Sequence, residues 1–368
     1  MPIADPLEEA RRQLTICNAC RYCEGYCAVF PSLELRTEIA RKDALHLANL
    51  CHDCRGCYYA CMYTPPHEFA MNIPQILSLV RAGTYRDYGR PAGVSRILGG
   101  GVRGPAIAAT VGILAAVVVA FAFRAPGEFL AARAGPGSFY RIVPYAVMAG
   151  AFLGLTAFVA GVALDAVASY WRDTHGRLSA LLDARAHAGA LRDALSLRYL
   201  NDTADGCYYP GERPGRQRSV FHHLVFYGFL ADLISTTIAA FLHNIVGVES
   251  PYPVVSAPVL FGIGGGIAQI AGTIGLLWLK WRSDARPAAA KMASRDYAFL
   301  AMLNLVSVTG MLVLMLRETS ALGPVLVVHL GTVAGLFLTM PYGKFVHFLY
   351  RYAALVQNRI ELAREGGR

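Results

Sequence analysis

Long hydrophobic runs alternate with polar segments along most of this chain. Six runs are each long enough to cross the roughly 30 Å hydrocarbon core of a bilayer, which takes about 20 helical residues. They cover residues 105–124, 143–168, 220–246, 254–279, 297–316 and 322–349. The pattern predicts a bundle of six transmembrane helices.

Polar residues dominate the segments outside these runs. Residues 1–103 precede the first run and carry eight of the nine cysteines, so we expect a separate domain followed by a linker. Residues 172–218 have apolar positions at three- and four-residue steps, which predicts an amphipathic helix at the membrane surface. The membrane domain is thus expected over 104–350 and a tail over 351–368.

Positive charges in the loops predict the orientation, because Lys and Arg concentrate on the cytoplasmic side of membrane proteins. The second loop, the fourth loop and the tail hold seventeen of them, against four in the other loops. The seventeen are Arg172, Arg177, Arg185, Arg192, Arg198, Arg213, Arg216, Arg218, Lys280, Arg282, Arg286, Lys291, Arg295, Arg351, Arg359, Arg364 and Arg368. We expect both termini in the cytoplasm, and the stretch MPIADPLEEARRQ does not have the pattern of a secretory signal.

The composition agrees with a protein embedded in a lipid bilayer. Hydrophobic residues make up 55% of the chain and charged residues 16%, whereas about a quarter of the residues of a soluble protein are charged. The net charge of +9 is explained by arginines that flank membrane spans. No basic stripe with interleaved aromatic residues appears, so we expect no nucleic-acid partner.

Two cysteine motifs with the same spacing, C-x2-C-x2-C-x3-C, lie in the N-terminal part. In two-cluster ferredoxins such a run gives three thiolates to one 4Fe-4S cluster and its fourth to the other. In a reducing compartment, closely spaced cysteines are metal ligands rather than disulfides. The spacing predicts two clusters, one on Cys17, Cys20, Cys23 and Cys61, the other on Cys51, Cys54, Cys57 and Cys27.

Structural zinc is the alternative, although zinc sites seldom take three thiolates at two-residue gaps. His52 and His67 lie near the motifs and are alternative ligands. The proline expected directly after the fourth cysteine comes later, at Pro31 and Pro65. Between the motifs, LELRTEIARKDALHLANL has a helical period, which predicts an all-helical ferredoxin-like domain.

Histidines in the third and sixth runs are candidate haem ligands, because ionisable groups in a membrane are costly and indicate function. The third run has His222 and His223 at its start and His243 near its end, and the sixth has His329 and His347. On a single helix, the last two would share one face, about five turns and roughly 27 Å apart. By helical phase, His222 is a better partner of His243 than His223 is.

These positions predict two stacked b-type haems with bis-histidine ligation, because two antiparallel helices would each offer a histidine at both ends. We expect His222 to meet His347 on the cytoplasmic side and His243 to meet His329 on the far side. The alternative is that these histidines lie at headgroup depth without a cofactor.

Other residues near these histidines allow two interpretations. Gly331 and Gly335 would let either a macrocycle or a helix approach closely. Lys344 and Arg218 are each one turn from a candidate ligand, and they could pair with haem propionates or serve as positive anchors at the headgroups.

Two further features point to no separate site. The glycine-rich stretch 261–272 lies inside the fourth run, so we expect close helix packing rather than nucleotide binding. Cys207 is a lone thiol that we interpret as an ordinary loop residue, with a redox or partner-contact role as the alternative. No G-x-G-x-x-G stands at a strand-to-helix turn, so we expect a flavin on a partner and not on this chain.

The paired cysteine motifs, the six runs and the stretch CYYPGERPGRQRSVFHHLVFYGF (207–229) resemble the tricarballylate-utilisation (citrate-utilisation) protein B family over nearly the whole chain. The stretches SPYPVVSAPVLFG and LLWLKWRSD carry the same resemblance. A related domain is fused to a flavoprotein in some bacterial cobalamin-pathway oxidases. The resemblance implies a protein of the bacterial inner membrane that reoxidises the reduced FAD of a partner dehydrogenase acting on tricarballylate or a similar acid.

Together these features predict an all-α protein with a ferredoxin-like domain followed by a six-helix membrane bundle. It would pass electrons from an FAD-containing dehydrogenase through two 4Fe-4S clusters and b-type haem to membrane quinone. Two alternatives stay open. One is a quinol-linked reductase subunit of the nitrate-reductase or heterodisulfide-reductase type, and the other is a haem-free membrane scaffold or redox sensor.

Overall fold

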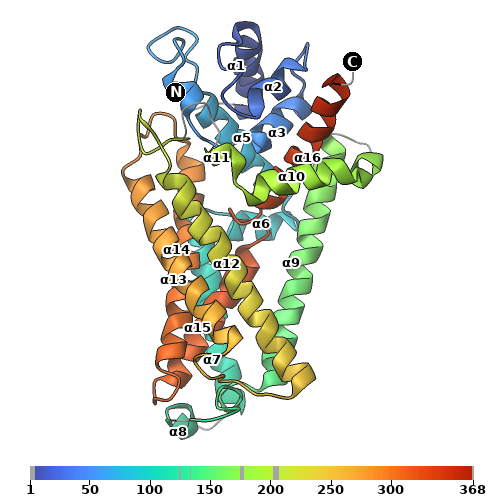
Figure 1. Cartoon of the computed structure of the whole chain (residues 1–368). Helices are drawn as coiled ribbons and strands as arrows, with labels where there is room; N and C mark the ends of the chain where they lie inside the picture. Colours follow the sequence, from blue (N-terminus) through green and yellow to red (C-terminus); the bar gives the residue numbers. More distant parts are fainter. Residues whose placement is uncertain (1–4, 124–125, 133, 175–177, 202–206, 367–368) are drawn as a thin grey trace.

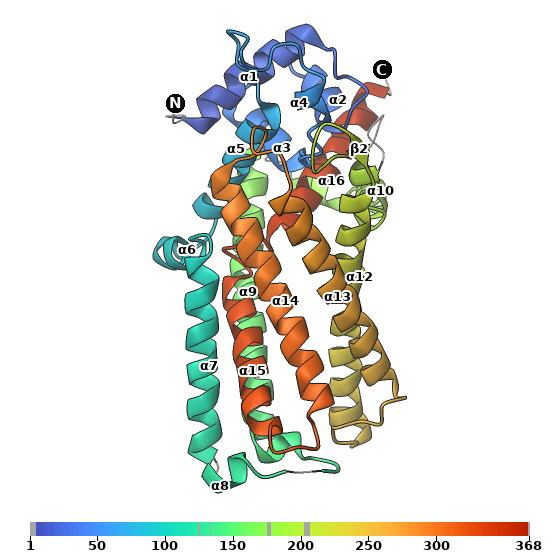
Figure 2. The ribbon, with the colours of Figure 1, turned by 90° about the vertical axis from the view of Figure 1, so that its left-hand side faces the viewer.

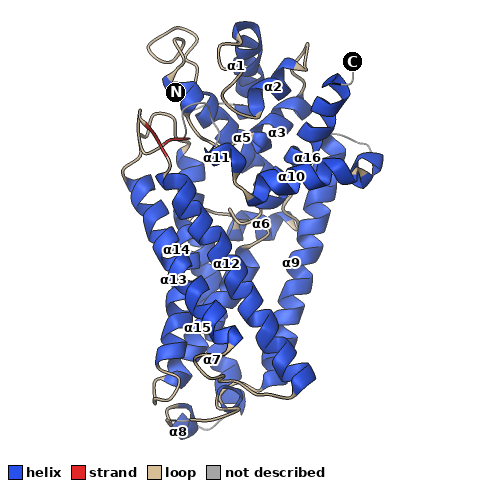
Figure 3. Cartoon of the chain, viewed as in Figure 1, coloured by secondary structure: helices blue, strands red, loops and turns tan. Residues whose placement is uncertain are grey.

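The computed structural model describes residues 5–123, 126–132, 134–174, 178–201 and 207–366. Over these residues the chain is almost entirely helical (Figure 3). The described strands are β1 (Cys207–Tyr208) and β2 (Pro214–Gly215), which pair antiparallel. The all-α fold class expected from the sequence is confirmed.

Five helices form the N-terminal domain at one end of the molecule (Figure 1). They are α1 (Pro6–Cys20), α2 (Val29–Glu34), α3 (Arg41–Leu50), α4 (Gly56–Tyr59) and α5 (Ile73–Asp87). The Asp5 carboxylate caps α1 by accepting from the backbone N–H of Leu7 at 2.8 Å, and the Asn72 side chain caps α5. A short helix, α6 (Ala92–Leu98), leads to the first apolar helix.

Six helices of the described chain are long and apolar enough to cross a membrane, as the sequence predicts. They form an elongated bundle next to the N-terminal domain (Figures 1 and 2). They are α7 (Arg103–Phe123), α9 (Tyr145–Thr174), α12 (Gln217–Phe241), α13 (Ala257–Trp281), α14 (Ala290–Met315) and α15 (Leu322–Thr339), and a π-helical turn, η3 (Leu242–Val246), continues α12.

Short elements connect these helices. They are α8 (Pro126–Phe129), η1 (Phe139–Arg141), η2 (Leu178–Leu182), α10 (Ala184–Leu195) and α11 (Arg198–Asn201). Helix α10 lies within the stretch expected to be amphipathic, and it packs against the C-terminal helix α16 (His347–Gly366). Arg177 and Arg368, which count toward the expected orientation, lie outside the described residues.

The sixth apolar run is not one helix to residue 349, so this prediction was wrong. Helix α15 ends at Thr339, and a turn follows in which the backbone N–H groups of Tyr342 and Gly343 both donate to the Thr339 carbonyl, at 3.1 and 2.8 Å. Pro341 has no N–H with which to continue the helix. His347 therefore begins a new helix, and the argument that it shares a helix face with His329 does not hold.

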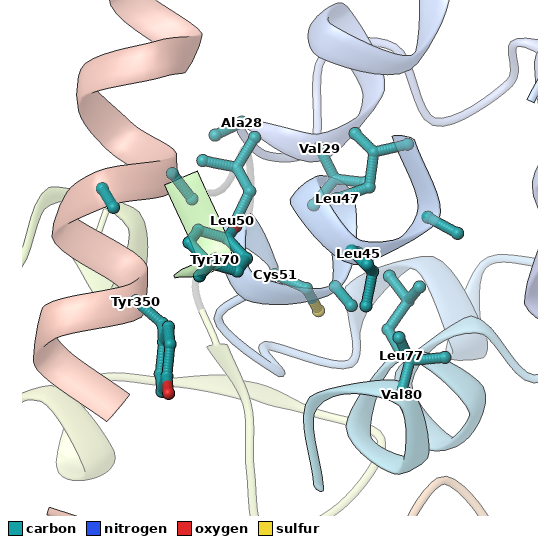
Figure 4. Packing of buried hydrophobic residues seen from close by; sticks show 14 of the residues in the cluster. Ala28, Val29, Leu45, Leu47, Leu50, Cys51, Leu77, Val80, Tyr170 and Tyr350 are labelled. Carbon is teal, nitrogen blue, oxygen red and sulfur yellow. The ribbon is translucent and has the colours of Figure 1, made fainter. Parts of the chain in front are cut away.

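The N-terminal domain and the ends of several bundle helices share one hydrophobic core (Figure 4). Leu45 and Leu77 of the domain belong to the same cluster as Tyr170 of α9 and Tyr350 of α16. The Tyr350 ring lies 5.3 Å from the Tyr170 ring and 5.6 Å from that of Tyr85, between centroids. The domain is therefore packed firmly against the bundle. Residues expected to form a C-terminal tail instead belong to α16, which contributes to this core.

Glycines allow two close helix contacts inside the bundle. A Cβ atom on Gly331 would lie 2.4 Å from the Ile113 Cα atom of α7, and one on Gly335 would lie 2.7 Å from that of Ala109. These glycines therefore seat helix α7. In the stretch 261–272, a Cβ atom on Gly265 would meet the Gly228 carbonyl of α12 at 2.8 Å, which confirms helix packing there.

Candidate functional site

The first cysteine motif lies at the end of α1 and in the turns after it. Cys17 and Cys20 belong to the last turn of α1, and Cys23 follows. Burial raises the pKa of the Cys17 thiol, and the neighbouring thiols of Cys23, Cys61 and Cys20 raise it further. The structure thus brings Cys61, from the other motif, to three cysteines of the first.

These four thiols line a pocket at the surface of the domain, which Cys57 also lines. Cys20 is exposed, and the pocket rim includes Tyr22 and Met62, which are 61% and 66% exposed. Large hydrophobic side chains with this exposure are typical of a contact surface rather than of a core.

The second motif is more deeply placed. Cys51 and Cys54 are buried, and Cys51 lies beside the shared core (Figure 4). The pKa of the Cys54 thiol is raised first by a hydrogen bond with Cys27 and then by burial. Cys57 lies near both groups, because its pKa is raised by burial, then by Cys54 and Cys51, and less by Cys23.

Both motifs contain residues with a left-handed backbone conformation. Arg21, Asp53 and Arg55 each stand between two cysteines and have left-handed φ angles of 55°, 55° and 66°. Arg21 is the C-cap of α1 and donates its N–H to the Cys17 carbonyl. Left-handed residues in turns such as those at Asp53 and Arg55, in contrast, occur in the anion-binding nests of iron–sulfur sites. The N–H group of Asp53 donates to the Cys51 sulfur at 3.4 Å. The second motif therefore fits an anionic, sulfur-rich group.

Within the described ranges, no group of three or more His, Cys, Asp or Glu side chains converges as the ligands of a single metal ion. A 4Fe-4S cluster does not require this, since it binds its four thiolates through different irons. His67 accepts from the N–H group of Phe69 at 3.1 Å through Nδ1, and the His52 ring lies against the Tyr199 ring, with the centroids 5.3 Å apart and the planes inclined by 46°.

Four arginines surround the second motif: Arg55, Arg81, Arg218 and Arg351. Among the described residues, one carboxylate lies within ion-pair distance of them, that of Asp53, at 3.9 Å from Arg55. The Nε atoms of Arg55, Arg81 and Arg351 are buried without a hydrogen-bond partner in this part of the chain. Buried positive charge is costly unless it is compensated, so this shell fits the net negative charge of a thiolate-bound cluster.

The segment from Cys207 to Tyr209 packs directly on the second motif. The N–H group of Tyr208 donates to the Cys54 carbonyl at 2.9 Å, and Cys207 is fully buried with its sulfur 3.7 Å from the same carbonyl. The Tyr209 ring lies under the guanidinium groups of Arg55 and Arg218, at 4.4 and 4.9 Å. Interpreting Cys207 as an ordinary loop residue was therefore wrong.

His222 and His347 lie against each other. Their ring centroids are 6.3 Å apart, and the ring planes are inclined by 79°. A metal held between two imidazole nitrogens at roughly 2 Å from each requires about this separation. His347 Nδ1 lies 2.7 Å from the Lys344 carbonyl, a bond that leaves Nε2 available to a metal when Nδ1 carries the proton.

The environment of this pair also fits neutral metal ligands. Burial, followed by the charges of Lys344 and Arg351, lowers the pKa of His347 well below its usual value. His222 Nδ1 is buried and has no hydrogen-bond partner among the described residues. His223 is oriented differently, because its Nδ1 atom lies 2.9 Å from the Ser219 carbonyl and its ring stacks on Tyr227.

His243 and His329, the pair expected on the far side of the membrane, do not show the same geometry. His243 lies in the π-helical turn η3, with its ring 3.7 Å from the Tyr145 ring and 5.0 Å from that of Tyr140. His329 Nδ1 lies 3.0 Å from the Thr309 hydroxyl. The structure records no contact between His243 and His329 in the described chain, so it brings together one of the two expected pairs.

The two candidate propionate partners have protein partners of their own. Lys344 and Lys280 both bind the Asp296 carboxylate, at 2.9 and 2.5 Å. The three side chains together therefore carry one net positive charge. Arg218 binds backbone carbonyls of the second motif, those of Asp53 at 2.5 Å and His52 at 3.2 Å.

Sequence reasoning missed the part played by Arg81 and Arg351. Arg351 entered only as a positive charge of the C-terminal tail, and Arg81 did not enter at all. One available signal was the four-residue spacing of His347 and Arg351, which places both on one face of a helix.

Comparisons with known proteins agree with this architecture. The family model of the citrate utilization protein B Fer4-like domain matches residues 10–87, and that of citrate utilization protein B matches residues 103–368. Citrate utilization protein B of Escherichia coli is 38% identical over 366 residues, which cover 98% of this chain and 94% of that protein. No solved structure matches this chain.

Proposed function

The chain belongs to the citrate utilization protein B family, and from this premise we propose that it carries electrons from a soluble flavoprotein into the membrane. Its Fer4-like domain indicates an iron–sulfur electron-transfer role. The proposed path runs from the reduced FAD of a dehydrogenase for tricarballylate or a similar acid, through two 4Fe-4S clusters and b-type haem, to membrane quinone.

The observation that carries this proposal is the His222–His347 pair, whose ring centroids are 6.3 Å apart and whose helices each carry an arginine that binds the second cysteine motif. When bound, the clusters and haem supply one-electron redox chemistry. The protein's residues supply the ligands, their spacing and the surrounding charge. The first cysteine group would hold one cluster at the surface, and the second would hold another next to the bundle.

The exposed rim of the first group is the proposed docking surface for the flavoprotein. Cys20, Tyr22 and Met62 line the same pocket and are exposed, so a partner could approach the first cluster without rearrangement of the domain. The basic segment around α10 would add attraction for an acidic partner, so association should weaken as salt increases.

The inner histidine pair supports one haem, and a second haem on His243 and His329 stays a prediction. We place the domain, and with it α16, on the cytoplasmic side of the bacterial inner membrane because the positively charged loops favour that side. Quinone is the proposed acceptor because it is a membrane-soluble carrier that the bundle could reach.

The test uses purified protein in quinone-containing vesicles with the flavoprotein and its substrate. Haem reduction should require intact clusters, and haem reoxidation should require quinone. Omission of the substrate is the control for nonspecific reduction. Rapid haem reduction in a Cys17→Ser, Cys51→Ser variant would contradict the proposed order, and purified protein without a haem spectrum would remove the haem step altogether.

A further inference from the structure

Each histidine of the inner pair is one helical turn from an arginine that binds the second cysteine motif. Arg218 precedes His222 by four residues on α12, and Arg351 follows His347 by four residues on α16. Residues four apart lie on the same helix face. Two separate helices therefore connect the candidate haem ligands to the same cysteine loop.

Arg218 binds this loop at several points. Its Nη1 atom donates to the Asp53 carbonyl at 2.5 Å and to the Cys207 sulfur at 3.3 Å, and its Nη2 atom donates to the His52 carbonyl at 3.2 Å. The planar guanidinium group can make these bonds together because its donors are arranged as a fork.

Arg351 of α16 and Arg81 of α5 bind the same cysteine loop as Arg218. Arg351 donates to the Cys51 carbonyl at 2.7 Å, and Arg81, from α5, donates to the same carbonyl and to that of Ala48 at 3.0 Å. Each of the two arginines keeps a buried Nε atom without a partner among the described residues. Burial and the nearby charge of Arg81 lower the pKa of Arg351 to about 10.

The positive charges of these arginines act differently on the oxidised and the reduced form of a bound cluster. Reduction adds one negative charge to a cluster, and nearby positive charges stabilise the reduced form more than the oxidised form. The first cysteine group has no comparable shell of arginine contacts in the described chain, and Cys20 is open to solvent, where charges are screened.

We propose that Arg81, Arg218 and Arg351 raise the reduction potential of the cluster on Cys51, Cys54, Cys57 and Cys27 above that of the other cluster. When both groups are bound, these cysteines would hold the cluster that gives single electrons to a haem held by His222 and His347. One electron would leave the reduced cluster and reduce the haem iron from ferric to ferrous, with no transfer of atoms. The inference rests on the proposed function and adds the order of the two clusters and the residues that set it.

The test is a redox titration of the purified holoprotein followed by electron paramagnetic resonance, with the second cluster assigned by the signal that a Cys51→Ser variant loses. Arg351→Gln and Arg218→Gln should each shift its potential downward by about a tenfold change in equilibrium constant, which is 59 mV for a one-electron couple. The first cluster should be unchanged. Arg351→Lys keeps the charge and should retain most of the potential, which separates charge from structure.

An opposite change and a matched control complete the test. Asp53→Asn removes a carboxylate of the second motif whose charge acts on Arg81 and Arg218, and it should shift the same potential upward, even if an arginine variant fails to assemble. Arg295→Gln is the control, because Arg295 is also buried and binds two carbonyls, those of Gly99 and Ala82 at 3.1 and 2.9 Å. Unchanged potentials, or equal shifts of both clusters, in protein with full iron and haem would overturn this inference alone. Protein without clusters or haem would overturn the proposed function with it.

Discussion

Cys27 and Cys54 lie next to each other, although they belong to different cysteine motifs, and Cys27 raises the pKa of the Cys54 thiol. The converse exchange also occurs, since Cys61 lies among the cysteines of the first motif. The fourth cysteine of each motif therefore lies near cysteines of the other motif. This exchange ties the two loops into one unit, so neither cluster should assemble independently of the other loop.

The first prediction concerns these exchanged ligands. Cys27→Ser should damage mainly the cluster of the second motif, and Cys61→Ser mainly that of the first. Each variant should lose up to about four of roughly eight non-haem irons, from four irons per cluster. Iron, sulfide and electron paramagnetic resonance measurements on anaerobically purified protein would show this.

Cys207→Ser is the matched control, since this cysteine lies outside both motifs, and it should keep both clusters. Loss of the same cluster in the Cys27 and Cys61 variants would contradict the exchange. Stoichiometric zinc with little sulfide would instead support the structural-zinc alternative.

The second prediction separates His222 from His223. His222→Ala should abolish the inner haem, because His347 would then have no partner across the 6.3 Å gap. His223→Ala should keep it, because that ring stacks on Tyr227. Haem content and the low-spin spectrum of each purified variant are the measurements, and haem loss confined to the His223 variant would reverse the assignment.

The six apolar helices could be predicted from the sequence because a bilayer requires long runs of apolar residues, and such runs are a local property. The end of α15 at Thr339 was missed because apolar residues resume at Phe345 and Val346, so the short turn before them was taken as part of one run. Pro341 and Gly343 were the available signals for a break. Hydropathy measures burial in lipid and does not register where backbone hydrogen bonding ends.

Contacts of the site that depend on the tertiary fold could not be predicted. Nothing in the local pattern around Cys207 indicates that its strand binds the Cys54 carbonyl, because the two are joined only in the folded protein. His222 was favoured over His223 by helical phase along one helix. The structure places His222 against His347 for another reason, since His347 begins a separate helix.

The third prediction concerns the contact between α7 and α15. Gly335→Ala would place a Cβ atom 2.7 Å from the Ala109 Cα atom, so the helices must separate, at a cost of about 1–3 kcal/mol. Gly154→Ala on α9 is the control, because nothing lies within 4 Å of its added Cβ atom. The control should be neutral or stabilising by up to about 1 kcal/mol, since alanine favours a helix. Thermal unfolding in detergent compares the two, and equal midpoints would argue against the tight contact.

The fourth prediction concerns pH and the buried His46. Burial lowers the pKa of His46 to about 3, and its Nε2 atom lies 3.3 Å from the Ser32 hydroxyl. His46 takes up a proton near pH 6.5 in the unfolded chain but not in the folded domain. Its contribution to the free energy of unfolding is therefore fully present above pH 6.5 and is lost as the pH falls toward the pKa of the folded state. Unfolding of the domain should cost about 2 kcal/mol less at pH 5 than at pH 7.

Hydrogen exchange of α3 and α5 amides between pH 7 and pH 5, corrected for intrinsic rates, measures this effect. His46→Gln cannot take up the proton and should flatten the dependence. An equally steep dependence in the variant would assign the effect to other groups.

The fifth prediction concerns removal of the clusters by a chelator. Without an anionic cluster, the arginines around the second motif lack compensation, and the domain should lose on the order of 3 kcal/mol of stability beyond the loss of the ligand bonds. Arg81 is the residue of choice for testing this, because its side chain is buried and its Nε atom has no partner among the described residues. Arg81→Met keeps most of the side-chain volume and removes the charge.

The variant should therefore be less stable than the natural protein when the cluster is present and lose less stability when it is removed. The difference between the two losses is the coupling free energy of Arg81 and the cluster, expected at about 1–3 kcal/mol. Hydrogen exchange of residues 48–61, with and without iron, provides all four values. A coupling near zero would mean that the cluster does not compensate this charge, and the arginines would then have to be explained by the carbonyl groups that they bind.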